Sequence, residues 1–449
     1  MKNIKRKIFL TLLICLTLLI SYLIFTPFDG MPASVKIAKI QYFSSSILSE
    51  IFNLEGDSFK DENEEFGNTY RLLHVDHWVE TGLEREDIES AFNTMRSSKK
   101  PRYKKEYDTV SEYGPGNWVY EFEQFGDRYF KEAKASENNG EGQKAKRLYI
   151  KASMYYKVAA FPGITREWNP TYQAVENVYK KCLLAYEKYG QFLAYSIERV
   201  TTTIDGTDIF GYLHLPQAAS NGSVPLVVLT NGTDFFMTEL YSFTEKFLDA
   251  GFGVFVFDIP GIGASHKITL KPGVEGTNLH RAFLSELSKD SRIDNNKIGL
   301  FGKSLGGNVA TRLAFTEESD TIKFVVNMCG PVDGVSQVPI DVLRENFPAM
   351  TFDALLARFS DAKERNEQAI ITGLRGLGLI YTGLIKEGIK TRVPILSINT
   401  QSDPANPIWE MKLLTKISQG GEMIIADGNG HCPANENPEQ IINWIQKIL

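Results

Sequence analysis

The order of apolar and polar positions divides this chain into three parts. An almost unbroken apolar run covers residues 8–25. From about residue 40 to 190 the apolar side chains recur at helical spacing, most clearly in the segments 118–135, 141–160 and 170–189. From about residue 195 onward, short apolar runs typical of buried strands alternate with helical segments. The pattern therefore predicts an N-terminal apolar segment, a helical region over 40–190 and an α/β domain over 195–449.

The third part predicts a mostly parallel sheet with flanking helices. Its strand-like runs lie at 194–204, 209–215, 225–230, 253–258, 322–328, 393–398 and 422–426, with a further one beginning at Lys297. Strands that alternate with helices are joined by right-handed crossovers, which bring the strands side by side in parallel. The segment 335–390 is too long for an ordinary connection and has helical spacing. We interpret it as a helical lid inserted at the carboxyl edge of the sheet.

The apolar run near the N-terminus predicts a membrane segment. Its 18 residues, at 1.5 Å each in a helix, come close to the thickness of a hydrocarbon core. Four basic residues precede it, at positions 2, 5, 6 and 7, and no small-residue cleavage site follows it. We therefore predict an uncleaved signal anchor within residues 1–30, with the rest of the chain outside the cytoplasm. A cleaved signal peptide and a secreted or periplasmic protein are the alternative.

The strongest chemical signal is the sequence Gly-Lys-Ser-Leu-Gly at residues 302–306. An apolar strand precedes it, and residues 308–315 follow it with helical spacing. In that context a G-x-S-x-G motif places Ser304 on a sharp turn with its hydroxyl exposed. The two glycines lie where side chains would clash. Because the chain holds 36 glycines, the five letters alone are weak evidence, and the strand–turn–helix context carries the prediction.

A serine nucleophile needs a base, and the base needs an acid that orients it. On strand–turn–helix folds of this kind the chain order is Ser, then acid, then His. Of six histidines only His431 follows Ser304, so we predict His431 as the base. Asp403, after the strand at 393–398, is the predicted acid. Two alternatives stay open: Asp333, one strand earlier, could be the acid, and Asp403 could be only a turn or helix-cap residue.

Two backbone amides are candidates for an oxyanion hole. The first is the N–H of Leu305, at the start of the helix that follows the serine, where the helix dipole favours negative charge. The second lies in the turn after the strand at 225–230, with Thr233 the first choice and Gly232 the next. Together with Ser304, these amides would surround a reacting carbonyl.

Composition and cysteine usage narrow the function further. The net charge of −6 and the lack of a basic-aromatic cluster argue against a nucleic-acid partner. The four cysteines form neither a C-x-x-C pair nor a Cys/His pattern, so we predict no metal site. Three of them lie outside the apolar run and cannot all pair with one another, so we expect no disulfide framework.

Two groups of residues resemble a known family. The motif at 302–306, the sequence Asp-Ile-Pro-Gly-Ile-Gly at 258–263, Asp403 and His431 resemble the α/β-hydrolase fold. More narrowly, residues 107–120 and 152–162 resemble the helical N-terminal region of FrsA-like esterases. The resemblance, over roughly residues 70–449, implies hydrolysis of a small carboxylic ester, a helical cap over 40–190 and no cofactor. The apolar run is not part of that pattern, so a cytosolic location does not follow from it.

The leading hypothesis is a cofactor-independent serine hydrolase that cleaves an ester through an acyl-enzyme intermediate. One alternative keeps the same three residues but applies them to a peptide or C–C bond. Another, from a different class, is a non-catalytic membrane-tethered protein whose helices bind a partner. Covalent labelling by a fluorophosphonate separates the enzymatic hypotheses from the last one.

Overall fold

The computed structural model describes residues 66–403, 405–428, 430–433 and 437–449. The predicted signal anchor lies outside these residues. Within them, no helix combines the length and the apolar character that crossing a membrane requires.

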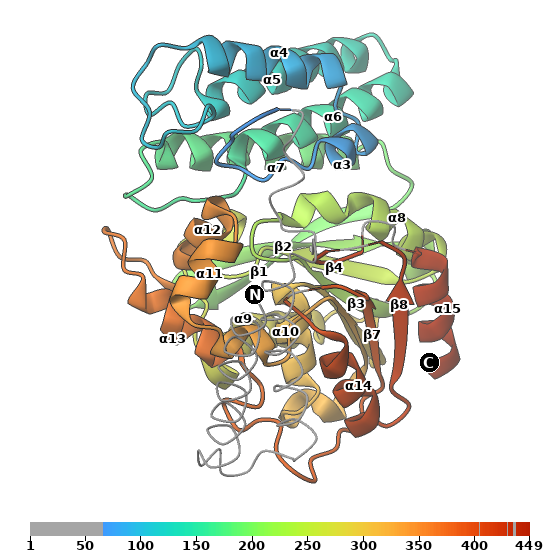
Figure 1. Ribbon diagram of the computed structural model, residues 1–449. Coiled ribbons are helices and arrows are strands. Elements are labelled where there is room, and N and C mark those ends of the chain that lie inside the picture. The colour runs from blue at the N-terminus through green and yellow to red at the C-terminus, as the bar shows by residue number, and fades with distance from the viewer. Residues whose placement is uncertain (1–65, 404, 429, 434–436) are drawn as a thin grey trace, which may run out of the picture.

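A helical region comes first and lies over one end of the sheet (Figure 1). Its helices are α3 (Val75–Glu80), α4 (Arg85–Ser97), α5 (Trp118–Asn138), α6 (Gly142–Ala160) and α7 (Tyr172–Gly190). The three long helices pack side by side, with α6 between α5 and α7. Gly126 of α5 lets α6 approach closely, since a β-carbon there would lie 2.5 Å from the Tyr156 ring. Aromatic side chains of α6 therefore belong to the core: Tyr149, Tyr155 and Tyr156 are all buried.

The sheet has eight strands in the order β1-β2-β4-β3-β5-β6-β7-β8. In chain order they are β1 (Ser196–Ile204), β2 (Thr207–Leu215), β3 (Val224–Thr230), β4 (Gly253–Phe257), β5 (Ile293–Lys303), β6 (Ile322–Met328), β7 (Ile395–Thr400) and β8 (Glu422–Ala426). The β1–β2 and β2–β4 pairs are antiparallel, whereas β3 to β8 pair in parallel. A mostly parallel sheet was predicted, and this prediction is confirmed.

Helices cover both faces of the sheet, as the alternation of strand side chains requires. On β3, Val227 and Leu229 share one core with α8 (Tyr241–Asp249), α15 (Pro438–Ile448) and the N-terminal helices. Leu226 and Val228, which point the other way, join the core beneath α9 (Asn278–Leu287), α10 (Leu305–Leu313) and α14 (Ile408–Ile417). The N-terminal helices are thus continuous with one of the two cores.

The segment 335–390 carries three helices: α11 (Ile340–Asn346), α12 (Ala349–Phe359) and α13 (Gln368–Leu377). In Figure 1, α12 lies beside the lower edge of the N-terminal helices. Short 3-10 helices complete the connections, at Gln217–Ser220, Met237–Leu240, Gly263–Ser265, Gly273–Thr277, Glu317–Asp320 and Gly334–Gln337.

Buried polar contacts join the N-terminal helices to the sheet domain. Lys157 of α6 pairs with Glu239 at 2.9 Å, with both side chains buried. Tyr179 of α7 donates a hydrogen bond of 2.6 Å to the carboxylate of Asp258, the residue directly after β4. Burial raises the pKa of Asp258 to about 6, although Tyr179 and the backbone N–H groups of Ala264 and Met237 oppose the shift. Because unpaired polar groups are costly in such an interior, these contacts fix how the two parts meet.

One expectation from the sequence was wrong: Cys329 and Cys432 form a disulfide. The two residues are 103 positions apart, and they meet because the end of β6 and the segment after β8 both lie at the carboxyl edge of the sheet. Three cysteines cannot all pair, but two of them can. The third, Cys182, is buried in α7 as a free thiol.

Candidate active site

Ser304 lies at a strained turn between β5 and α10. Its backbone has φ 52° and ψ −121°, in the left-handed half of backbone space that side chains rarely occupy. The motif glycines are needed for space: a β-carbon at Gly302 would lie 2.2 Å from the Gly306 carbonyl oxygen, and one at Gly306 would lie 2.5 Å from that of Thr230. The Ser304 N–H donates to the Met328 carbonyl at 2.8 Å. Backbone packing alone therefore holds the serine.

The structure brings the three residues named from the sequence together. Ser304 Oγ and His431 Nε2 are 2.8 Å apart, and His431 Nδ1 lies 3.0 Å from both carboxylate oxygens of Asp403. Ser304 follows β5, Asp403 follows β7 and His431 follows β8, so all three lie at the carboxyl edge of the parallel part of the sheet. The side chain of Asp403 is fully buried, whereas that of His431 is 19% exposed. This hydrogen-bonded chain could move a proton between the hydroxyl and the imidazole.

The two candidate acids have different surroundings. Asp403 accepts backbone N–H groups from Ala405 at 2.7 Å and Asn406 at 3.1 Å while it contacts His431. The carboxylate of Asp333 instead accepts the N–H groups of Ile380 and Tyr381, at 3.1 and 2.7 Å. Asp403 thus acts as a turn residue and orients the imidazole at the same time. Asp333 ties the lid insertion to the end of β6.

The electrostatics of His431 follow from its neighbours. Burial alone would lower the pKa of the imidazole, but the Asp403 carboxylate, through its charge and its hydrogen bond, raises that pKa above the ordinary 6.5. Asp234, in the turn after β3, adds to the increase. The imidazolium form is therefore stabilised at the position where a base would receive a proton.

The oxyanion candidates flank the serine. Leu305 is the first residue of α10, so its N–H has no partner within the helix. Gly232 lies directly against the nucleophile, since a β-carbon there would be 3.0 Å from Ser304 Cβ and 3.4 Å from Ser304 Oγ. The carbonyl of Thr233 accepts from Arg358 Nε at 2.7 Å. The turn that carries both candidate amides is therefore tied to α12 of the 335–390 segment.

Arg358 was not singled out from the sequence. It is completely buried on α12 and donates to the carbonyls of Thr233, Pro162 at 3.0 Å and Gly261. Burial lowers the pKa of its guanidinium to about 9. One side chain thus joins the lid, the N-terminal helices and the turn beside Ser304. Nothing in the sequence pattern distinguishes this arginine from the exposed Arg344 and Arg365, because its hydrogen-bond partners are all backbone carbonyls from distant segments.

Phe235, in the turn after β3, lies near both the N-terminal helical region and Lys303. His74 directly precedes α3, and its ring centroid lies 5.5 Å from that of Phe235. His77 is within α3, and its ring centroid lies 6.2 Å from that of Phe235. Lys303, the neighbour of the serine, places its Nζ 5.9 Å from the same ring centroid. Burial lowers the pKa of His77 to about 3, so its imidazole is neutral at physiological pH. Two histidine rings and the Lys303 ammonium group thus gather around the Phe235 ring.

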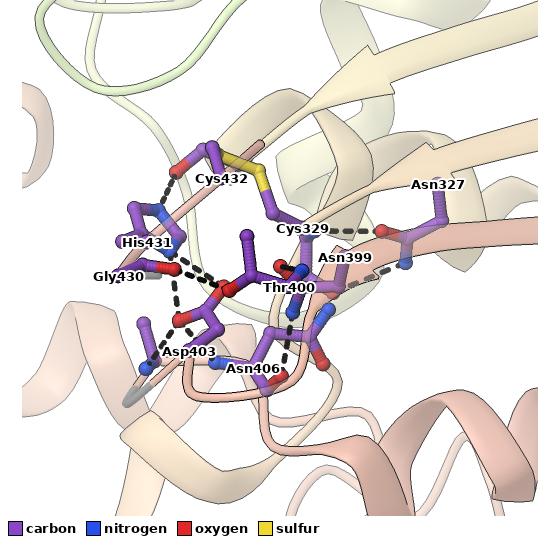
Figure 2. The surroundings of a disulfide bond; sticks show 12 residues. Asn327, Cys329, Asn399, Thr400, Asp403, Asn406, Gly430, His431 and Cys432 are labelled. Atoms are coloured by element: carbon purple, nitrogen blue, oxygen red, sulfur yellow. Dashed lines mark hydrogen bonds and ion pairs between the residues drawn. A yellow bond between two sulfur atoms is a disulfide. The ribbon is translucent and has the colours of Figure 1, made fainter. Parts of the chain in front are cut away.

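One group of potential metal ligands lies beside the serine. A ligand atom of His431 and the sulfurs of Cys329 and Cys432 lie within 4.8 Å of one another. The two sulfurs are bonded to each other (Figure 2), and the imidazole is hydrogen-bonded to Ser304 and Asp403. With the disulfide formed, neither cysteine offers a thiolate, which is the form of cysteine that binds a metal ion.

A parallel sheet with Ser304, Asp403 and His431 at its carboxyl edge defines an α/β-hydrolase. The structure of 2,6-dihydroxy-pseudo-oxynicotine hydrolase has the same fold, with a TM-score of 0.63, 18% identity, and coverage of 83% of this chain and 95% of that one. The AbyA5 wild-type structure matches with a TM-score of 0.58 and 15% identity, over 81% of this chain and 88% of that one.

Sequence comparison gives a narrower assignment. The family description "Esterase FrsA-like" matches residues 33–449, so the chain belongs to the FrsA-like esterase family. Esterase FrsA of Photobacterium profundum is 27% identical over 413 residues, covering 90% of this chain and 94% of the relative. Esterase FrsA of Vibrio cholerae is 28% identical over 387 residues, with 85% and 88% covered. The predicted resemblance is confirmed, and the non-catalytic hypothesis loses its support.

Proposed function

We propose that this esterase hydrolyses a small carboxylic ester through an acyl-enzyme intermediate, with Ser304 as nucleophile, His431 as base and Asp403 as the orienting acid. The observation that carries the proposal is the continuous hydrogen-bonded chain from Ser304 Oγ through His431 to Asp403, at 2.8 and 3.0 Å. The strained backbone at Ser304 supports it, because such strain persists where function requires it.

In the first half of the reaction Ser304 Oγ attacks the ester carbonyl carbon while His431 Nε2 takes the hydroxyl proton. The negative charge that develops on the carbonyl oxygen is received by the N–H groups of Leu305 and Thr233, with Gly232 the alternative to Thr233. Asp403 stabilises the imidazolium. His431 then returns the proton to the departing alkoxide, and the alcohol leaves an acyl group on Ser304.

In the second half a water molecule attacks the acyl carbonyl. His431 takes one proton from the water and gives it back to Ser304 Oγ as the carboxylic acid departs. We expect the N-terminal helices and the 335–390 segment to limit which esters reach Ser304, because Arg358 ties both of them to the Thr233 turn. No step needs a cofactor.

Replacement of the nucleophile tests the proposal. Ser304→Ala should lower kcat for a short-chain nitrophenyl ester by about 10⁴-fold or more and abolish labelling by a fluorophosphonate. The matched control is Ser288→Ala on the exposed end of α9, which should label and turn over like the wild type. Unchanged labelling of the Ser304 variant would show that another group is the nucleophile.

We also propose that residues 1–30 anchor the chain in a membrane, with the esterase domain outside the cytoplasm. The basic cluster before the apolar run supports this orientation, and the family match begins only at residue 33, after that run. The full-length chain should sediment with membranes, and protease added from the cytoplasmic side should leave the domain intact. A soluble product cut near residue 30 would support the cleaved signal peptide instead.

A further inference from the structure

Around His431, the described residues 427–428 and 430–433 form neither helix nor strand. They follow β8, an edge strand with largely exposed side chains, and precede α15. Two hydrogen bonds hold Gly430: Thr400 Oγ1 donates to its carbonyl at 2.6 Å, and its N–H donates to Ser402 Oγ at 3.2 Å. The second of these bonds is exposed, so water competes with it.

A covalent bond adds to these contacts immediately after the histidine. Cys432 is the next residue, and its partner Cys329 is the residue after β6. Figure 2 shows the bond joining the histidine segment to the end of that strand. Cys329 is fully buried, and its N–H donates to the Ile398 carbonyl of β7 at 2.8 Å. One end of the disulfide is therefore built into the interior of the sheet.

Cys329, the buried end of the disulfide, is also connected to the backbone of Ser304. Met328, the last residue of β6, accepts the N–H of Ser304 at 2.8 Å, and Cys329 follows it directly. The chain of connections runs from the Ser304 amide to Met328, then to Cys329, then through the disulfide to Cys432 and His431. The disulfide thus sets the distance between the two segments whose side chains must meet at 2.8 Å.

We propose that the Cys329–Cys432 disulfide is a positioning element for the catalytic base, and that the esterase is fully active only when this bond is formed. The inference rests on the proposed function of His431. A shift of the imidazole by about 1 Å can lower turnover by about 10²-fold, because proton transfer requires a short hydrogen bond. With the bond broken, hydrogen bonds to Gly430, Ser304 and Asp403 still hold the imidazole and its segment, but the covalent link between that segment and the end of β6 is lost.

The redox step is a thiol–disulfide exchange with an external dithiol such as dithiothreitol. The dithiol supplies two electrons and two protons, the S–S bond breaks, and Cys329 and Cys432 become thiols. The dithiol itself is oxidised to a cyclic disulfide. Within the described residues this is the disulfide that the reagent can reduce, since Cys182 is a free thiol.

The test compares the wild type, Cys329→Ser, Cys432→Ser and the double variant, all as full-length protein, with and without dithiothreitol. The matched control is Cys182→Ser, whose hydroxyl can use the existing partners Ser153 and Thr238. Cys15 lies outside the described residues and is unchanged in every variant. If the double variant does not fold, wild type that has been reduced and alkylated takes its place.

We expect reduction, or either cysteine replacement, to lower kcat by about 10- to 10²-fold with little change in KM. At acidic pH, kcat/KM rises as His431 loses its proton, and the midpoint of this rise should move to lower pH. The reason is that a displaced imidazole loses the Asp403 contact that raises its pKa. Dithiothreitol should not change the activity of the double variant, which has no Cys329–Cys432 bond to reduce. It should lower the activity of Cys182→Ser only as much as that of the wild type.

Two results would overturn the inference. A double variant with wild-type kcat and an unchanged pH profile would show that the bond does not position His431, even if its melting temperature falls. An oxidised wild type that neither hydrolyses esters nor reacts with a fluorophosphonate would refute the proposed function, and the inference with it. The first result leaves the proposed function intact, so the two failures can be told apart.

Discussion

The proposed nucleophile and the proposed base are held in opposite ways. Around Ser304 the backbone is so dense that a β-carbon at Gly302 or Gly306 would lie within 2.5 Å of a carbonyl oxygen. In the segment before His431, a β-carbon at Gly428 or Gly430 would meet nothing within 4 Å. The serine is positioned by close-packed backbone, and the histidine by side-chain hydrogen bonds and a disulfide. A local motif can encode the first arrangement, whereas the second depends on distant residues.

The largest effect should come from removing the partner that orients the base. Asp403→Asn should lower kcat by about 10⁴-fold at a nearly unchanged melting temperature, because the amide favours the wrong tautomer of His431. The control is Asp333→Asn, which should keep most of the activity. It should lose stability instead, since its carboxylate holds the N–H groups of Ile380 and Tyr381. The reverse pattern would move the acid to Asp333.

The turn beside the nucleophile depends on one arginine. Arg358→Lys keeps a positive charge but loses the planar fork that reaches several carbonyls at once, so the Thr233 turn should shift. We expect kcat to fall by about 10²-fold, with a smaller change in KM. Arg344→Lys is the control, since Arg344 is exposed on α11 and pairs only at the surface with Asp341 and Glu367. Equal kinetics for the two variants would argue against a role for Arg358 in positioning.

Alanine substitutions at a close-packed glycine near Ser304 and at an open glycine before His431 compare the packing of the two segments directly. Gly306→Ala should destabilise the fold by about 3 kcal/mol, because its β-carbon would lie 2.5 Å from the Thr230 carbonyl oxygen. Gly428→Ala has open space and should cost only about 1 kcal/mol, from its backbone φ of 104°. Chemical denaturation of both variants gives the difference. A larger loss at Gly428 would contradict the proposed contrast in packing.

The pH dependence should show the smallest effect. His431 must be neutral to accept a proton, so kcat/KM should rise with pH through a midpoint above 6.5, where Asp403 places the imidazole pKa. Since the folded pKa is raised, the ion pair stabilises the fold below the unfolded pKa, and this contribution disappears as pH rises through the folded pKa. In His431→Gln that stability term should be absent. A wild-type midpoint below 6.5 would show that burial outweighs Asp403.

Residues whose role depends on chain order and local pattern were predictable. The strand, the sharp turn and the helix around Ser304 lie within about twenty consecutive residues, so the motif together with its strand and helix was enough to recognise the turn. His431 was named because it is the one histidine after Ser304. For the acid, however, the sequence left Asp403 and Asp333 open, because both follow strands of the same sheet and both occupy turns.

The sequence by itself determined the α/β architecture, the motif glycines and the candidates for nucleophile and base, since each depends on side-chain spacing within one element or on order along the chain. Only the tertiary structure decided which aspartate meets His431, which arginine holds the Thr233 turn, and that Cys329 pairs with Cys432 across 103 residues. The physical reason is that these contacts form where parallel strands end side by side. Their partners are distant in sequence and become neighbours through the order of strands in the sheet.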